Sequence, residues 1–188
     1  MAAPPARDFG LKTVDFLLPG VDGGPHTLAY ICGPNEKLIM FICNHCPYAK
    51  AIADKFARDA SVLWVLGIGV AVICANDATS YPANSFANME NFAEQSGFTF
   101  PCLQNDRQAV AGAYDAICTP DFFGLTAAGA LQYHGRLDES KAAPIPNARR
   151  GLVQAMCQIA ETDQGPREQS FPNWLPDQME ACRVRASW

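Results

Sequence analysis

The hydrophobic and polar positions of the chain alternate between two periods, which predicts strands and helices in turn. Residues 38–42 and 69–75 are continuous apolar runs of strand length, typical of strands buried on both faces of a central sheet. From Pro47 to Phe56, apolar residues recur every four positions, which predicts one face of a helix. Pro47 fits the first turn, because the amide it lacks would have no partner within the helix.

The remaining segments complete a recognisable order of elements. Turn residues at 19–25 precede a predicted strand at 27–31. Downstream we expect a helix that begins after Ser85 and stops at Gly97, a helix after Asp106, a β-hairpin of strands 121–125 and 131–136, and a last helix capped by Asn147.

This order predicts an α/β fold, a thioredoxin-like sandwich. We expect a mixed central sheet flanked by helices, with an N-terminal β extension and an irregular C-terminal tail. Residues 1–161 would form the domain, and residues 162–188 would be a tail packed on it.

Composition narrows the class of function. The chain has 188 residues, a net charge of −5 and 18% charged residues, without a cluster of Lys and Arg. Nucleic acids and anionic membranes need a concentrated basic surface, so we expect neither as a partner. The first residues lack the charged start of a secretory signal, and the apolar run at 62–75 is shorter than the ~20 residues of a membrane span. We expect a cytoplasmic protein.

Eight cysteines stand out, but most are expected to be packing residues. Eight in 188 is below the roughly 8–10% of a disulfide scaffold. Buried thiols behave as small hydrophobic groups. Four of them lie in apolar or helical segments and are read as core: Cys32, Cys74, Cys102 and Cys157.

The pair Cys43 and Cys46 is different, because its C-x-x-C spacing falls between a predicted strand and a helix start. In a cytosolic α/β chain this pattern indicates thiol–disulfide chemistry. We expect both cysteines in the first turn, with Cys43 exposed and its pKa lowered by the helix N-terminus. Cys43 would attack a target disulfide, and Cys46 would then release the target.

The two residues between the cysteines are expected to tune this couple. A partly protonated His45 would stabilise a Cys43 thiolate, with Asn44 beside it. The alternative is that His45 is a solvated residue at a helix start, without influence on the cysteines.

A second predicted contribution comes from Thr119-Pro120, just before a strand. In a thioredoxin-like fold this proline is expected to be cis, with the preceding backbone beside the C-x-x-C where a substrate chain can pair. Cys118 could serve as a third thiol in the relay, or be a buried small residue.

Four ordered motifs carry a family resemblance: residues 41–48, residues 76–82, residues 116–123 and residues 135–138. Together they resemble the peroxiredoxin-like group of thioredoxin-fold proteins, related to alkyl hydroperoxide reductase and thiol-specific antioxidant proteins, over about Phe16 to Glu161. The resemblance implies a redoxin-type fold and thiol oxidoreductase activity, with Cys43 as nucleophile and Cys46 as its partner. The group's usual tail motif is altered here, although Cys182 is kept, and Cys182 is a possible auxiliary thiol.

Three other functions stay open. One is a thiol peroxidase, whose motif is Pro-x-x-x-Thr/Ser-x-x-Cys. Alignment of its cysteine with Cys46 puts Cys43 at the hydroxyl position and Ile39 at the proline position, so a dedicated peroxidase is disfavoured and weak peroxide reduction by Cys43 is the alternative. A structural metal needs four ligands, and the motif offers three, so we expect no metal and no cofactor. Aromatic residues of the tail could instead dock a partner: Phe171, Trp174 and Trp188.

The expected partners are protein or small-molecule disulfides and thiols, with a thioredoxin or glutathione system as reductant. Three polar residues at strand ends could line the site or form ordinary caps and ion pairs: Asp77, Arg136 and Asp138. His26 and His134 are read as structural. The strand at 38–42 holds no carboxylate, so the proton acceptor for Cys46 is unassigned.

Overall fold

The structure is a computed structural model that describes residues 9–31, 35–79, 81–105, 107–140, 145 and 148–169. Its elements follow in the order β1 (Leu17–Pro19), β2 (Pro25–Thr27), β3 (Lys37–Ile42), α1 (Pro47–Val65), β4 (Gly69–Cys74), the 3-10 turn η1 (Pro82–Asn84), α2 (Phe86–Gln95), β5 (Cys102–Gln104), α3 (Ala109–Ala113), β6 (Asp121–Leu125), β7 (Leu131–Gly135) and α4 (Gly151–Thr162).

The central sheet is mixed, as the sequence predicts. Its strands lie in the order β5-β4-β3-β6-β7, and β1 and β2 form a separate two-stranded hairpin. The pairs β3–β4 and β4–β5 are parallel, whereas β6 is antiparallel to both β3 and β7. The thioredoxin-like α/β arrangement is therefore confirmed, including the N-terminal β extension.

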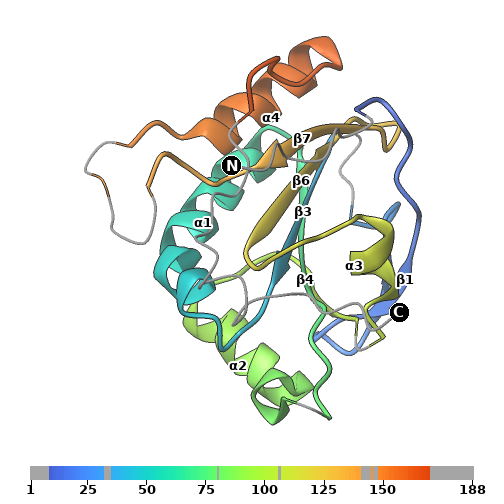
Figure 1. Ribbon diagram of the computed structural model, residues 1–188, viewed down its shortest axis with the longest axis vertical. Helices are drawn as coiled ribbons and strands as arrows, with labels where there is room; N and C mark the ends of the chain where they lie inside the picture. The colour runs from blue at the N-terminus through green and yellow to red at the C-terminus, as the bar shows by residue number, and fades with distance from the viewer. Residues whose placement is uncertain are drawn as a thin grey trace.

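Two apolar layers cover the sheet and explain why β3 and β4 are buried at every position. One face packs against α1, α2 and α4, with Met40 and Phe56 in its core. The other face carries Phe41 and Phe123 and is covered by α3 and the β1–β2 hairpin. Figure 1 shows α1 and α4 on one side of the sheet and α3 and β1 on the other.

The strand predicted at 27–31 is wrong in position. β2 ends at Thr27, and the carbonyl oxygen of Thr27 accepts hydrogen bonds from the amides of Tyr30 (3.1 Å) and Ile31 (3.2 Å). The Thr27 hydroxyl oxygen also accepts from the Tyr30 amide at 3.1 Å. Thr27 thus closes a turn where the apolar alternation predicted a ladder.

The last helix begins later than predicted. Arg150 occupies the N-cap position of α4, and Asn147 lies outside the described residues.

Beyond α4, the Gln169 side chain accepts from the His134 amide at 2.9 Å and donates to the Gln132 carbonyl at 2.9 Å, so this part of the tail lies along β7. Predictions for residues 170–188, including the docking aromatics and Cys182, fall outside the described residues. No helix in the described ranges is long and apolar enough to cross a membrane.

Candidate active site

The C-x-x-C lies where β3 passes into α1, as predicted, but only one cysteine belongs to the helix end. Cys46 is the N-cap of α1 and Pro47 its first residue. The Cys46 carbonyl oxygen accepts a hydrogen bond from the Lys50 amide at 3.1 Å, and the Cys46 amide donates to the Cys43 carbonyl oxygen at 3.0 Å. Because Pro47 sets the first turn, Cys43 lies before the helix, and the expectation of both cysteines inside the first turn is wrong.

Cys43 is buried, which overturns a second expectation. Its exposed fraction is 0%, so its sulfur lies under the surface and not at an exposed end. Burial raises the pKa of the Cys43 thiol to about 12, whereas the backbone amides of His45 and Cys46 act in the opposite direction. The expected lowering of this pKa is therefore wrong for the state described here, in which Cys43 is a thiol at neutral pH.

His45 is half-buried and contacts the sulfur directly, while its influence on the redox couple stays a prediction. The Sγ atom of Cys43 lies 2.9 Å from Nδ1 and 3.4 Å from Nε2 of His45. The imidazole stacks on the ring of Tyr81, with ring centroids 5.9 Å apart. The histidine is thus held over the thiol between the motif and the segment that follows β4.

Asn84 is a member of this site that the sequence reasoning missed. Its Oδ1 lies 3.1 Å from His45 Nδ1 and accepts from the Cys43 thiol at 3.4 Å. The backbone carbonyl of Asn84 accepts from the Gln104 side chain at 3.0 Å, and the residue is fully buried. Thiol, imidazole and amide oxygen therefore meet at one point.

A signal for Asn84 did exist in the sequence. Parallel β3 and β4 end side by side, with Ile42 paired to Cys74. The segments that follow such strands share one edge of the sheet, where α/β proteins place their sites. The turn at 82–84 after Tyr81 is thus a candidate, although the sequence pattern there predicts only that a helix begins after Ser85.

Asn44 fixes the same turn from the motif side. Its Nδ2 donates to the carbonyl oxygen of Ala83 at 2.6 Å, and the residue is 6% exposed. Asn44 Oδ1 is buried without a hydrogen-bond partner among the described residues. Asn44 and His45 therefore join the motif to η1 by two independent contacts.

The Thr119–Pro120 peptide bond is cis and lies beside Cys46, as expected. The Cys46 thiol donates to the Thr119 carbonyl oxygen at 3.3 Å, and both residues are buried. The Cys118 thiol is buried and its sulfur lies 4.0 Å from the Pro120 carbonyl oxygen. The cis turn thus contacts the second cysteine of the C-x-x-C. A role for Cys118 as a third thiol stays a prediction.

A buried acid–histidine pair holds this cis turn in place. Asp121 Oδ1 lies 2.6 Å from His134 Nε2, and its Oδ2 accepts from the Ile117 amide at 3.2 Å. Neither side chain of the pair is exposed. His134 is therefore structural, as predicted, and its partner is the residue that follows Pro120. His26 is likewise held within the N-terminal hairpin, with Nε2 2.9 Å from Asp22.

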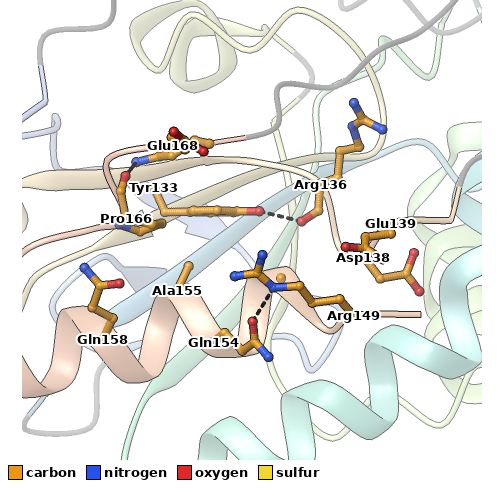
Figure 2. A pocket seen from close by; sticks show the side chains of 12 residues that line it. Tyr133, Arg136, Asp138, Glu139, Arg149, Gln154, Ala155, Gln158, Pro166 and Glu168 are labelled. Atoms are coloured by element: carbon orange, nitrogen blue, oxygen red, sulfur yellow. Dashed lines mark hydrogen bonds between the residues drawn. The ribbon is translucent and has the colours of Figure 1, made fainter. Parts of the chain in front are cut away.

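Asp77 and Asp138 at strand ends form hydrogen bonds with residues outside the C-x-x-C motif. Asp138 accepts from Lys55 at 2.9 Å, and Asp77 accepts from the Thr79 amide at 2.8 Å. Arg136 and Asp138 border a hollow of about 250 Å³ between β7, α4 and residues 166–169, which shares no lining residue with the motif. Figure 2 shows this hollow, where Tyr133 donates to the Arg136 carbonyl and Arg149 to Gln154.

The other cysteines in the described ranges behave largely as predicted. Cys74 and Cys102 are buried in the layer that packs against α1, and Cys157 packs partly against the same layer. Cys32 and Cys182 lie outside the described residues. Within the described ranges, no three His, Cys, Asp or Glu side chains converge as metal ligands.

The chain as a whole is similar to proteins of known structure. The chain is similar to an uncharacterized conserved protein from Geobacillus kaustophilus, with 32% identity, a TM-score of 0.81 and coverage of 94% of this chain and 99% of that one. A hypothetical protein from Sinorhizobium meliloti 1021 shares 29% identity, with a TM-score of 0.80 and coverage of 88% and 91%.

A more distant likeness concerns the fold alone. A secreted Mycobacterium tuberculosis disulfide oxidoreductase homologous to E. coli DsbE has 16% identity, a TM-score of 0.56 and coverage of 78% of this chain and 95% of that one. No curated protein gave a significant match. The model of the AhpC/TSA family matches residues 9–134, which span the C-x-x-C and the cis turn and agree with the resemblance found in the sequence. The chain belongs to the AhpC/TSA family.

Proposed function

We propose that this protein is a thiol–disulfide oxidoreductase in which Cys43 is the nucleophile and Cys46 the resolving thiol. The observation that carries the proposal is the contact of Cys43 Sγ with His45 Nδ1 at 2.9 Å. Cys46, three residues after Cys43, lies at the N-cap of α1. Family membership and a thioredoxin-like fold support the same chemistry.

The first step needs a thiolate on Cys43. Because burial raises the pKa of this thiol to about 12, a base in contact with it is required near neutral pH. His45 Nδ1 can take the proton, and Asn84 Oδ1 at 3.1 Å then accepts a hydrogen bond from the imidazolium. The sulfur must also become uncovered for attack, since it is fully buried as described.

The reaction then runs by exchange of sulfur bonds. The Cys43 thiolate attacks one sulfur of a disulfide, the S–S bond of the target breaks, and the departing thiolate takes the proton from His45. Cys46 next loses its proton to the second departing thiolate as its sulfur attacks Cys43. One substrate disulfide is reduced to two thiols, and one Cys43–Cys46 disulfide forms, so electrons and protons balance.

We propose that the Thr119–Pro120 turn presents its backbone to a substrate chain beside this pair. The contact of Cys46 with the Thr119 carbonyl puts the turn within reach of the second cysteine. A thioredoxin or glutathione system would return the disulfide to thiols. We propose the cytoplasm, because the described cysteines Cys74, Cys102, Cys118 and Cys157 are not joined in disulfides, which is compatible with a reducing compartment.

Reduction of a model disulfide by purified protein with an excess reductant tests the assignment. Cys43→Ser should abolish turnover, and Cys46→Ser should stop it after a mixed disulfide that is visible by mass spectrometry. Cys157→Ser, which removes a half-buried thiol on α4, is the matched control and should keep turnover. Full activity of Cys43→Ser would overturn the proposal.

Thiol-dependent peroxide reduction is the second candidate, favoured by membership of the AhpC/TSA family. A Cys43 thiolate would attack hydrogen peroxide, the O–O bond would break, and the departing hydroxide would take the proton from His45, which gives a sulfenic acid and water. Cys46 would then form the disulfide with loss of a second water. Consumption of hydrogen peroxide and turnover of a disulfide, measured with the same reductant, separate the two functions. A higher kcat/KM for the disulfide supports the exchange reaction.

A further inference from the structure

A polar hollow of about 480 Å³ opens beside the C-x-x-C, between the start of α1 and α2. Two of its lining residues, Asn44 and His45, belong to the motif itself. The remaining lining residues are contributed by α1, η1 and α2: Lys50, Ala83, Asn88, Asn91, Phe92 and Gln95. Since His45 also touches the Cys43 sulfur, the hollow lies next to the reacting atom.

The lining has a definite chemistry. Four of the lining residues are amides, one is a lysine and none is a carboxylate. Amide side chains both donate and accept, so they match the N–H and C=O groups of a peptide. The Asn44 side chain belongs to this lining, and its amide oxygen is buried and unpartnered among the described residues.

Lys50 gives the hollow its charge preference. It lies in the first turn of α1, where the partial positive charge of the helix N-terminus adds to its own. The ion pairs found among described lysine and arginine side chains join Lys55 to Asp138, and Arg58 and Arg150 to Asp59; Lys50 is in none of them. Both charges therefore favour an anionic group in the hollow.

We propose that this hollow binds a short peptide disulfide and that Lys50 pairs with its carboxylate. This rests on the function proposed above and adds the class of substrate. The volume falls within the range of small-ligand sites, which suits a peptide of a few residues better than a folded protein surface. Amide groups on α2 would hold the peptide bonds while His45 lies next to the disulfide.

The test compares a charged and a neutral disulfide. Oxidised glutathione carries carboxylates and peptide bonds, whereas bis(2-hydroxyethyl) disulfide carries neither. The readout is the ratio of kcat/KM for the first to kcat/KM for the second. We expect Lys50→Gln to lower this ratio about threefold, as loss of one exposed ion pair predicts, and Lys50→Glu to lower it about tenfold. Lys12→Gln, which removes an exposed positive charge from the N-terminal segment, is the control and should keep the ratio.

The outcomes are distinct. An unchanged ratio in both Lys50 variants overturns the proposal, as does an equal change in Lys12→Gln. A Lys50 effect on reduction of insulin disulfides without one on oxidised glutathione assigns the carboxylate to a protein segment and overturns the short-peptide substrate. If the wild-type protein reduces none of these disulfides, the proposed function itself fails, which separates the two results.

Discussion

The Sγ atom of Cys43 lies 2.9 Å from Nδ1 of His45, beneath the protein surface. The two residues are only two positions apart, so the contact is made within the motif. It turns a thiol whose pKa is raised by burial into one that has its own base.

Replacing His45 by Phe should slow the modification of Cys43 at pH 7 by about tenfold or more, because general-base assistance of proton transfer is lost. The measurement is the rate of reaction with iodoacetamide in a Cys46→Ser background, followed by mass spectrometry across pH. In the His45→Phe protein the rate should keep rising with pH beyond pH 9, since ionisation of the buried thiol then depends on hydroxide alone. Equal rates at pH 7 in both proteins would contradict a role for His45.

Asn84 should act through His45. Asn84→Ala removes the oxygen 3.1 Å from Nδ1 and should lower the rate of Cys43 modification at pH 7 by about threefold to tenfold. Asn84→Asp keeps an acceptor for the imidazolium, but its charge also opposes a thiolate 3.4 Å away, so its rate should lie between those of Asn84→Ala and the wild-type protein. The matched pair separates an electrostatic role from a purely structural one, for which both variants would be equally slow.

Much of the fold could be predicted from periodicity. The apolar run at 38–42 and the four-residue spacing after Pro47 indicated β3 and α1, and the cis Thr119–Pro120 bond followed once the fold was expected. These features depend on local pattern or on the order of elements.

The details of the site could not be predicted in the same way. Cys43 and Asn84 are 41 positions apart, and the burial of the thiol depends on where the turn after β4 lies. A sequence pattern gives the strand end and the helix start, but not which side chain of a distant turn covers the sulfur. For this reason the expectations that Cys43 is exposed and that its pKa is lowered are wrong.

Gly124 should be intolerant of a side chain, because β6 passes closely under α4. A Cβ at this position would lie 2.6 Å from Met156 Sδ and 2.9 Å from Tyr133 Cβ. Gly124→Ala should therefore lower the free energy of unfolding by about 1–3 kcal/mol, measured by urea denaturation. Gly151→Ala, with open space around the new Cβ, is the control and should keep or slightly raise stability. A wild-type midpoint for Gly124→Ala would contradict this packing.

Stability should fall in alkaline solution. Burial, with a smaller effect of the Asp22 charge, raises the pKa of Cys102 from 9.0 to about 12. The folded protein therefore keeps a proton that the unfolded chain loses, so this contribution is present below pH 9 and is lost as pH rises from 9 towards 12. Each such thiol adds a slope of up to about 1.4 kcal/mol per pH unit to the fall in the free energy of unfolding.

The variant that checks the alkaline slope is Cys102→Ala. Its free energy of unfolding, measured by urea denaturation between pH 8 and 10.5, should decline less steeply than that of the wild-type protein, whatever its value at pH 7. Cys43→Ala should reduce the slope in the same sense, because burial also raises the pKa of Cys43 to about 12. Parallel slopes in all three proteins would show that neither thiol keeps its proton on folding, and a base-assisted Cys43 would then be unnecessary.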